Sequence, residues 1–184
     1  MRRTILFLIF ICPLLNGQRA NFYKESITFY LDSIHFSVEG YYWFSNNSNK
    51  PIYTNIFYPF PNFSNEKVDS ISVFNISTSM FTKFNKEGEG GISFNLFIEP
   101  YDTALFRICY RQQLKSDSAI YILRTTEGWG KPLDNAEYNL IVPQSFVIKG
   151  FSYPPTKSYD IVDKKIYVWK MKNFLPIQDM IFYF

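Results

Sequence analysis

The sequence predicts an all-β protein, an antiparallel immunoglobulin-like β-sandwich built from two small packed lobes. Aromatic residues make up 20% of the 184 residues and charged residues only 19%. This composition favours strands and excludes a disordered chain. Apolar and polar residues alternate with a period of two in successive segments, as they do in half-buried strands. No longer segment shows an apolar stripe with the 3.6-residue period of a helix.

The first 17 residues predict export. Arg2 and Arg3 precede an apolar run, and polar and small residues follow it. This order is typical of a secretory signal peptide, and the run is too short to cross a hydrocarbon core of ~30 Å as a helix. We expect cleavage after Gly17 or after Ala20, and a periplasmic, cell-surface or secreted mature protein. An uncleaved anchor or a buried N-terminal strand is the alternative.

Loss of the signal peptide changes both the charge and the cysteine count. Two arginines leave with it, so the mature chain is almost neutral and predicts neither a nucleic-acid partner nor an anionic membrane surface. Cys12 leaves as well, and Cys109 alone has no partner for an internal disulfide. We expect Cys109 to be a buried or inert strand cysteine.

The first expected strand spans residues 33–44. Ile34, Phe36 and Val38 alternate with polar residues, which places His35 on the polar face, where a histidine is ordinarily just a surface residue. An Asn- and Ser-rich turn follows, and then a second strand at residues 52–58. Two prolines stop that strand, because proline has no N–H group to donate to a sheet.

Further strands are expected at residues 68–76 and 80–84, before a Gly-rich turn at 85–91 that lacks the lysine of a phosphate-binding loop. Apolar residues alternate again over 92–98 and 106–111. We expect these two segments to be adjacent antiparallel strands, joined across residues 99–103.

Residues 115–118, Lys-Ser-Asp-Ser, are the expected linker between the two lobes. The first lobe would be a β-sandwich of residues 18–114, and the second lobe would comprise residues 119–184. In the second lobe, alternation and the positions of the prolines predict strands at 119–125, 138–142, 145–153, 160–162, 166–171 and 180–184. A hairpin turn at residues 163–165 would join the fourth and fifth of these.

The residue inventory contains no catalytic constellation. The chain has one His and two Cys, so zinc sites and a His-Glu-x-x-His motif are not supported. No Gly-x-Ser-x-Gly motif surrounds a serine, and no calcium loop is present. The sequence therefore predicts a protein that is not an enzyme, with no metal and no cofactor.

Three aromatic residues are the candidates for ligand binding. Trp129 lies between Gly128 and Gly130, where it would either plug the core or contact a ligand. Trp43 and Tyr41 alternate to the polar side of their strand. Exposed Trp and Tyr side chains can stack on glycans or peptides, so a protein or glycan partner is expected. The plain alternative is that the aromatic residues only fill the core.

Residues 41–61 combine an aromatic strand, an Asn-rich turn with a Pro and a strand that ends in alternating aromatic residues and prolines. Residues 126–143 contain Trp129-Gly130 and close on Pro143. Both segments resemble exported bacterial β-sandwich proteins of the VIT-like and DUF4424 type. The resemblance implies a scaffold or interaction role without assigned catalytic residues. The adhesion-type metal residues that often accompany VIT domains are missing, so no metal or adhesive activity follows from it.

The leading hypothesis is an exported β-sandwich protein that acts in binding or structural interaction at the cell envelope, with no membrane span in the mature chain. A small outer-membrane β-barrel is the alternative, favoured by the aromatic C-terminus at 180–184 and opposed by ten prolines. A carbohydrate-active hydrolase with a site assembled from scattered acids is the second alternative. The sequence does not predict the oligomeric state.

Overall fold

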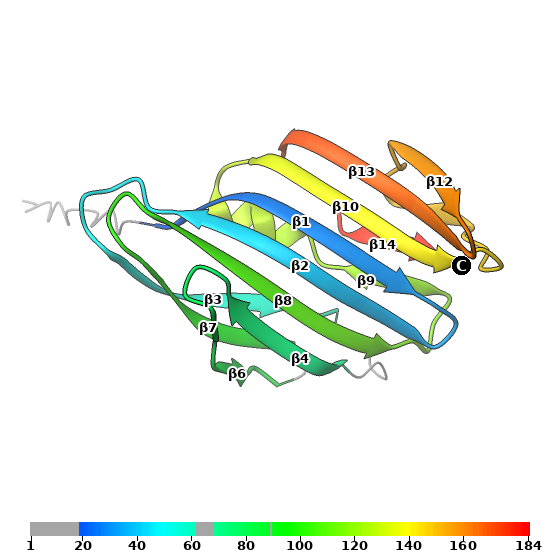
Figure 1. Ribbon diagram of the computed structural model, residues 1–184, viewed down its shortest axis with the longest axis horizontal. Coiled ribbons are helices and arrows are strands. Elements are labelled where there is room, and N and C mark those ends of the chain that lie inside the picture. The colour runs from blue at the N-terminus through cyan, green and yellow to red at the C-terminus, as the bar shows by residue number, and fades with distance from the viewer. Residues whose placement is uncertain (1–18, 62–67, 89) are drawn as a thin grey trace, which may run out of the picture.

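The computed structural model describes residues 19–61, 68–88 and 90–184. The expected signal peptide, residues 1–17, lies outside these ranges. The described residues form strands and one short 3-10 helix, with no α-helix among them. The strands pack in two layers (Figure 1), so the predicted all-β sandwich is confirmed. None of the described helical segments is both long enough and apolar enough to span a membrane.

One layer is a sheet of eight strands in the order β12-β13-β10-β1-β2-β8-β4-β5, and Figure 1 shows the strands from β12 to β4 side by side. Its pairings are antiparallel except for β1 with β10, which is parallel. The strands are β1 (Asn21–Leu31), β2 (His35–Ser45), β4 (Val68–Asn75), β5 (Met80–Phe81), β8 (Thr103–Gln113), β10 (Leu133–Pro143), β12 (Lys157–Ile161) and β13 (Lys164–Phe174).

The second layer is divided into two separate sheets of three strands, in the orders β3-β7-β6 and β11-β14-β9. Figure 1 shows both on the same side of the long strands. The strands are β3 (Ile52–Pro59), β6 (Phe84–Lys86), β7 (Gly91–Ile98), β9 (Ser118–Tyr121), β11 (Gly150–Phe151) and β14 (Met180–Tyr183). β3 and β9 are edge strands of their respective sheets, so the layer is interrupted between them.

The core lies between the layers and is built from rings of both. Phe29 of β1 lies 5.1 Å from Phe182 of β14 and 5.2 Å from Tyr121 of β9, measured between ring centroids. Phe106 of β8 lies 5.3 Å from Phe94 of β7. These five side chains are at most 4% exposed, and burying each contributes roughly 1.5–3 kcal/mol. Much of the aromatic content seen in the sequence therefore fills the core.

The expected pairing of residues 92–98 with 106–111 is wrong. These segments are β7 and β8, which belong to different layers and face each other across the core. The chain crosses between the layers in the turn that contains Tyr101, whose φ of 59° lies in the left-handed region. Alternation shows which side of a strand is apolar. It does not show whether two successive strands pair edge to edge or pack face to face.

Several strand boundaries also differ from the predictions. Residues 80–84 contain only the two-residue strand β5, before β6 begins at Phe84. Residues 119–125 leave the strand after Tyr121 and enter the 3-10 helix η1 (Arg124–Trp129). Residues 145–153 form only β11, because the chain turns at once after β10, where the Phe146 N–H donates to the Pro143 carbonyl at 2.9 Å. A hairpin does join β12 and β13, but its turn lies at residues 162–163, because Lys164 and Lys165 of the expected turn already pair with Ile161 and Asp160.

Strands from both sides of the expected linker at 115–118 share the large sheet. β1 pairs with β10 over seven positions, from Lys24 opposite Asn135 to Tyr30 opposite Ile141. The linker segment itself lies between β8 of the large sheet and β9 of the second layer, and Ser118 opens β9. The two parts of the chain therefore contribute to one sheet and to one core.

Candidate ligand-binding site

A pocket of about 570 Å³ lies where the second layer is divided. Its floor comes from β1 and β2 of the large sheet, and its walls come from residues 54–59 of β3, from Tyr121 and Ile122 at the end of β9, and from Gly128 and Trp129 of η1. Arg19, which is exposed, marks the side open to solvent. Pockets for small organic ligands usually have volumes of about 300–1,000 Å³.

A β-bulge turns Glu25 into this pocket. The register of β1 against β2 shifts between Phe22 and Lys24, so Tyr23 is an extra residue in the strand. Before the bulge Phe22 points inward, and after it Glu25 and Ile27 point inward. Without the extra residue, simple alternation from Phe22 would direct Lys24 to the core instead. The bulge therefore determines that an acid and not a base faces the pocket.

Glu25 is buried, with 2% of its surface exposed. Its Oε1 accepts a hydrogen bond from the Tyr138 hydroxyl of β10. Burial raises the pKa of the carboxyl to about 7, and the hydrogen bond from Tyr138 opposes this shift. Among the described residues, neither a second hydrogen bond nor an ion pair reaches this carboxyl. Its Oε2 therefore has a free acceptor site beside the pocket.

Three tyrosine hydroxyls meet at the same end of the pocket. Tyr42 Oη of β2 lies 2.8 Å from Tyr58 Oη of β3 and 3.0 Å from Tyr121 Oη of β9. Burial raises the pKa of each well above its ordinary value, so all three are neutral near pH 7. Three hydroxyls have three protons but share two hydrogen bonds, so one proton remains to be donated outside the cluster.

Gly40 makes room for this arrangement. It lies on the inward face of β2, two residues before Tyr42, and the Tyr42 ring lies over it. A methyl group at this position would overlap the ring and its hydroxyl. The absence of a side chain at Gly40 is therefore what allows the Tyr42 hydroxyl to reach Tyr58 and Tyr121.

Three aromatic rings also line the pocket. The Trp129 ring is half-buried and packs on Phe22 and Phe44 at centroid distances of 5.7 and 5.5 Å. Phe22 and Phe44 stack on each other at 5.2 Å. Trp129 was expected either to plug the core or to contact a ligand. It covers core rings and also lines the pocket.

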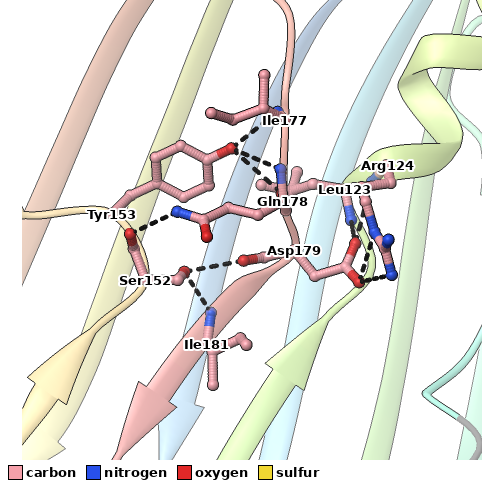
Figure 2. Close-up of polar contacts among 8 residues, drawn as sticks. All are labelled: Leu123, Arg124, Ser152, Tyr153, Ile177, Gln178, Asp179 and Ile181. Carbon is pink, nitrogen blue, oxygen red and sulfur yellow. Dashed lines mark hydrogen bonds and ion pairs between the residues drawn. The ribbon is translucent and has the colours of Figure 1, made fainter.

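The start of η1 is fixed by Asp179. Asp179 Oδ1 accepts hydrogen bonds from the Leu123 and Arg124 N–H groups at 3.0 and 3.1 Å (Figure 2). Its Oδ2 pairs with the Arg124 guanidinium at 3.2 Å. Because Trp129 is the last residue of η1, this anchor also sets the position of the pocket wall.

Asp179 is held in place by the segment around it. Ser152 Oγ donates to the Asp179 carbonyl and accepts from the Ile181 N–H, both at 2.8 Å. The Tyr153 hydroxyl accepts from the N–H groups of Ile177 and Gln178, both at 3.1 Å, as Figure 2 shows. This network connects the loop before β14 to the loop after β11, and through Asp179 to the pocket.

Trp43 and Tyr41, the other two candidates, lie on the outer face of the large sheet. Their ring centroids are 6.3 Å apart, and Lys24 Nζ lies 4.3 Å from the centre of the Trp43 ring. Both side chains are half-buried. The structure does not bring them together with Trp129, because inward and outward residues alternate along β2.

The remaining sequence candidates show no chemical site. His35 is at the start of β2 opposite Gln113, and Cys109 is half-buried on the outer face of β8. Burial raises the pKa of the Cys109 thiol, which disfavours the reactive thiolate. Within residues 19–61, 68–88 and 90–184, no three His, Cys, Asp or Glu side chains are grouped so that they could hold a metal ion.

Sequence reasoning did not single out Glu25 or the three tyrosines. A signal for Glu25 does exist, because Glu25 is in phase with Ile27, Phe29 and Leu31 in the segment 21–31. A charged residue in phase with the apolar positions of a strand indicates a buried charge. The tyrosines have no such signal, since only the packing of three different strands brings their hydroxyls together.

No protein-family model matches the sequence, and no curated protein matches it. The chain is similar in fold to a crystal structure from Legionella pneumophila named a "putative nutrient binding protein", with a TM-score of 0.67 and 13% identity over 90% of this chain and 67% of the other. It is also similar to the M1 zinc metallopeptidase from Deinococcus radiodurans, with a TM-score of 0.54 and 13% identity. That match covers 91% of this chain but only 43% of the peptidase.

At this level of identity the comparisons show the fold alone. They show that the same two-layer β architecture occurs within longer chains, since this chain spans less than half of the peptidase. The resemblance to VIT-like and DUF4424-type proteins is not tested by these matches and stays a prediction.

Proposed function

We propose that the protein is an exported binding protein that takes a small organic ligand into the pocket between its layers. The observation that carries this proposal is the pocket itself, in which one buried carboxyl and three hydroxyls face an aromatic wall. Ligand pockets commonly combine apolar walls with a few polar groups that fix orientation.

The place of action follows from the N-terminus. A secretory signal peptide at residues 1–17 would deliver the protein to the periplasm, the cell surface or the medium. The name of the Legionella pneumophila neighbour, a "putative nutrient binding protein", is compatible with ligand capture outside the cytoplasm. At the cell envelope such a protein would collect a small molecule for another component.

The pocket favours binding over catalysis. Glycoside hydrolysis ordinarily takes a pair of carboxyl groups on either side of the bond. Glu25 is the one acid among the described residues that line the pocket. A buried carboxyl with neutral tyrosines around it is better suited to holding a ligand than to acid–base exchange with a second group.

A second candidate function is contact with a protein or glycan through the outer face of β3 and β7. Tyr53 and Phe97 are 76% and 45% exposed, and their rings lie 5.6 Å apart. Beside them the Asn55 amide donates to Asn95 Oδ1 at 3.2 Å. Exposed rings next to amides are a common surface for stacking and hydrogen bonding.

A screen of small amines, acids, alcohols and arenes against the processed protein tests the leading proposal. The readout is the shift in melting temperature, followed by quenching of Trp129 fluorescence. Thr54→Trp would fill the pocket, whereas Tyr53→Trp adds the same side chain on the outer face of the same strand. We expect hits that bind the Tyr53→Trp variant and fail to bind the Thr54→Trp variant. Hits that bind both variants equally would contradict the proposal.

A further inference from the structure

We propose that the pocket selects a ligand with a protonated amine on an apolar or aromatic body, with the ammonium group placed against the Glu25 carboxylate. This inference rests on the proposed function and names the chemical class of its ligand. It starts from Glu25, a buried acid aimed into a cavity with one of its two oxygens unbonded among the described residues.

Among the described residues, no ion pair or basic hydrogen-bond donor balances the charge of Glu25. An isolated carboxylate is costly to bury unless a cation and hydrogen bonds accompany it. Among the described residues that line the pocket, Arg19 is the one basic group, and it is exposed at the open side without an ion pair to Glu25. A cationic ligand would supply the missing partner, whereas an anionic ligand would face the carboxylate and be repelled.

The acceptors around Glu25 match the donors of an ammonium group. An ammonium has three N–H bonds and no acceptor. Glu25 Oε2 can accept one, and the hydroxyl oxygens of the tyrosine cluster have lone pairs for the others. Glu25 and these tyrosines are close enough for its charge to raise the pKa of Tyr42 and Tyr121. The polar end of the pocket therefore has an acceptor for each donor of the ammonium group.

The aromatic wall suits the rest of such a ligand. Phe22, Phe44 and Trp129 pack together in the pocket lining. Aromatic faces attract both apolar bodies and nearby cations. A molecule with an ammonium at one end and a ring at the other would satisfy both sides at once.

Binding should depend on pH through one group. The titratable groups that face Glu25 are Tyr138 from β10, Tyr42 from β2, Tyr58 from β3 and Tyr121 from β9, with Arg19 at the open side. Burial raises the pKa of each tyrosine well above its ordinary value, so the tyrosines stay neutral from pH 6 to 8. Of these carboxyl and hydroxyl groups only the carboxyl ionises over this range, so the affinity for an amine should rise about tenfold.

The experiment compares 2-phenylethylamine, 2-phenylethanol and phenylacetate by calorimetric titration of the processed protein at pH 6 and pH 8. At pH 8 we expect the amine to bind at least about tenfold more tightly than the alcohol, and phenylacetate to bind weakest. Glu25→Gln should abolish the preference for the amine and its pH dependence. The control Glu39→Gln changes an acid on the outer face of β2 and should leave both unchanged.

The outcomes separate this inference from the proposed function. If the alcohol binds as tightly as the amine, the ligand class is wrong and binding in the pocket still stands. If none of the three binds the wild-type protein at either pH, the amine inference is overturned. The proposed function then depends on the wider screen with Thr54→Trp. The pH series uses the wild-type protein, so it tests the inference even if Glu25→Gln does not fold. An affinity for the amine that does not rise from pH 6 to pH 8 would contradict it.

Discussion

Asn46 and Glu25 are both buried polar residues, 1% and 2% exposed, but they are bonded in opposite ways. The Asn46 amide nitrogen lies within 3.2 Å of three backbone carbonyls, and its Oδ1 accepts from the Ser48 N–H and hydroxyl. Glu25 has one hydrogen bond, from Tyr138. A fully bonded buried group holds the fold together. A partly bonded one beside a cavity is available to a ligand.

The difference is also visible in what surrounds each residue. Asn46 ties the turn after β2 to the end of β7, at Ile98 and Glu99, and it is not among the residues that line the pocket. Glu25 lines the pocket, together with residues of β3 and β9, the edge strands between which the second layer is interrupted. The structure thus places one group where the layers join and the other where they leave space.

The largest expected effect is that of Asn46→Ala. The substitution leaves several buried backbone groups without a partner, each worth about 1–3 kcal/mol, and we expect a loss of about 3 kcal/mol in the free energy of unfolding. Urea denaturation measures it. The neighbouring Asn47 is exposed, and Asn47→Ala should change the stability by less than about 0.5 kcal/mol. If both variants lost the same free energy of unfolding, the hydrogen bonds of Asn46 would not stabilise the fold as the comparison with Glu25 requires.

Glu25 should make the protein less stable as the pH rises. Its pKa is about 7 when folded and 4.5 in the unfolded chain, so the folded state holds the proton over that interval while the unfolded state has lost it. The stabilisation is complete below pH 4.5 and is lost as the pH rises through 7. Between pH 5 and 8 we expect a loss of about 2–3 kcal/mol.

Unfolding of the wild-type protein and of Glu25→Gln in urea across this pH range measures the effect. The variant should lack this part of the pH dependence and be the more stable of the two at pH 8. A wild-type curve that rises with pH over the same range would show that Glu25 is paired or solvated.

Gly40→Ala should break the tyrosine cluster without touching its hydroxyls. The added methyl group overlaps the Tyr42 ring, and overpacking of this kind typically costs about 1–3 kcal/mol. We expect a loss of about 2 kcal/mol together with weaker binding of any pocket ligand. Gly150→Ala of β11, away from the pocket lining, is the matched control, since its new methyl group would meet its nearest atom, Tyr183 Cδ2, at an ordinary contact distance of 3.6 Å. Thermal unfolding and ligand titration of both variants give the answer.

Asp179→Ala should have the smallest effect on stability. It removes the anchor of η1, which is partly exposed, at an expected cost of about 1 kcal/mol. Trp129 should become more solvated, which a red shift of its emission would report when Trp43 is replaced by Phe. The control Asp160→Ala, on the exposed strand β12, should leave the emission unchanged. An unshifted emission spectrum in Asp179→Ala would show that Asp179 does not set the position of Trp129 in the pocket wall.

The alternation of apolar and polar residues was sufficient to predict the class of fold, because most strands show it in the sequence. It failed for β1, which was not expected at all. The bulge at Tyr23 breaks the period, and Lys24 and Glu25 follow it directly, so the first half of the strand resembles a polar loop. It failed again for β7 and β8, where the same alternation fits both pairing and facing.

The site was predictable only in one part. Trp129 attracted notice because two glycines flank it, and it does line the pocket. The polar end depends on Glu25, Tyr42, Tyr58 and Tyr121, which come from four strands. Their meeting depends on the layer order and on the gap between β3 and β9, and neither is encoded in any one segment.

The titration of the Glu25 carboxyl is the most direct test of the account. Carbon-detected NMR of protein labelled at the glutamate side chains follows the carboxyl carbon of Glu25 from pH 3 to 9, with Glu25→Gln to assign the signal. The account predicts a midpoint near 7 in the free protein, which moves lower when an amine ligand saturates the pocket. A midpoint near 4.5 in the free protein would contradict it, because the carboxyl would then be hydrated or paired already.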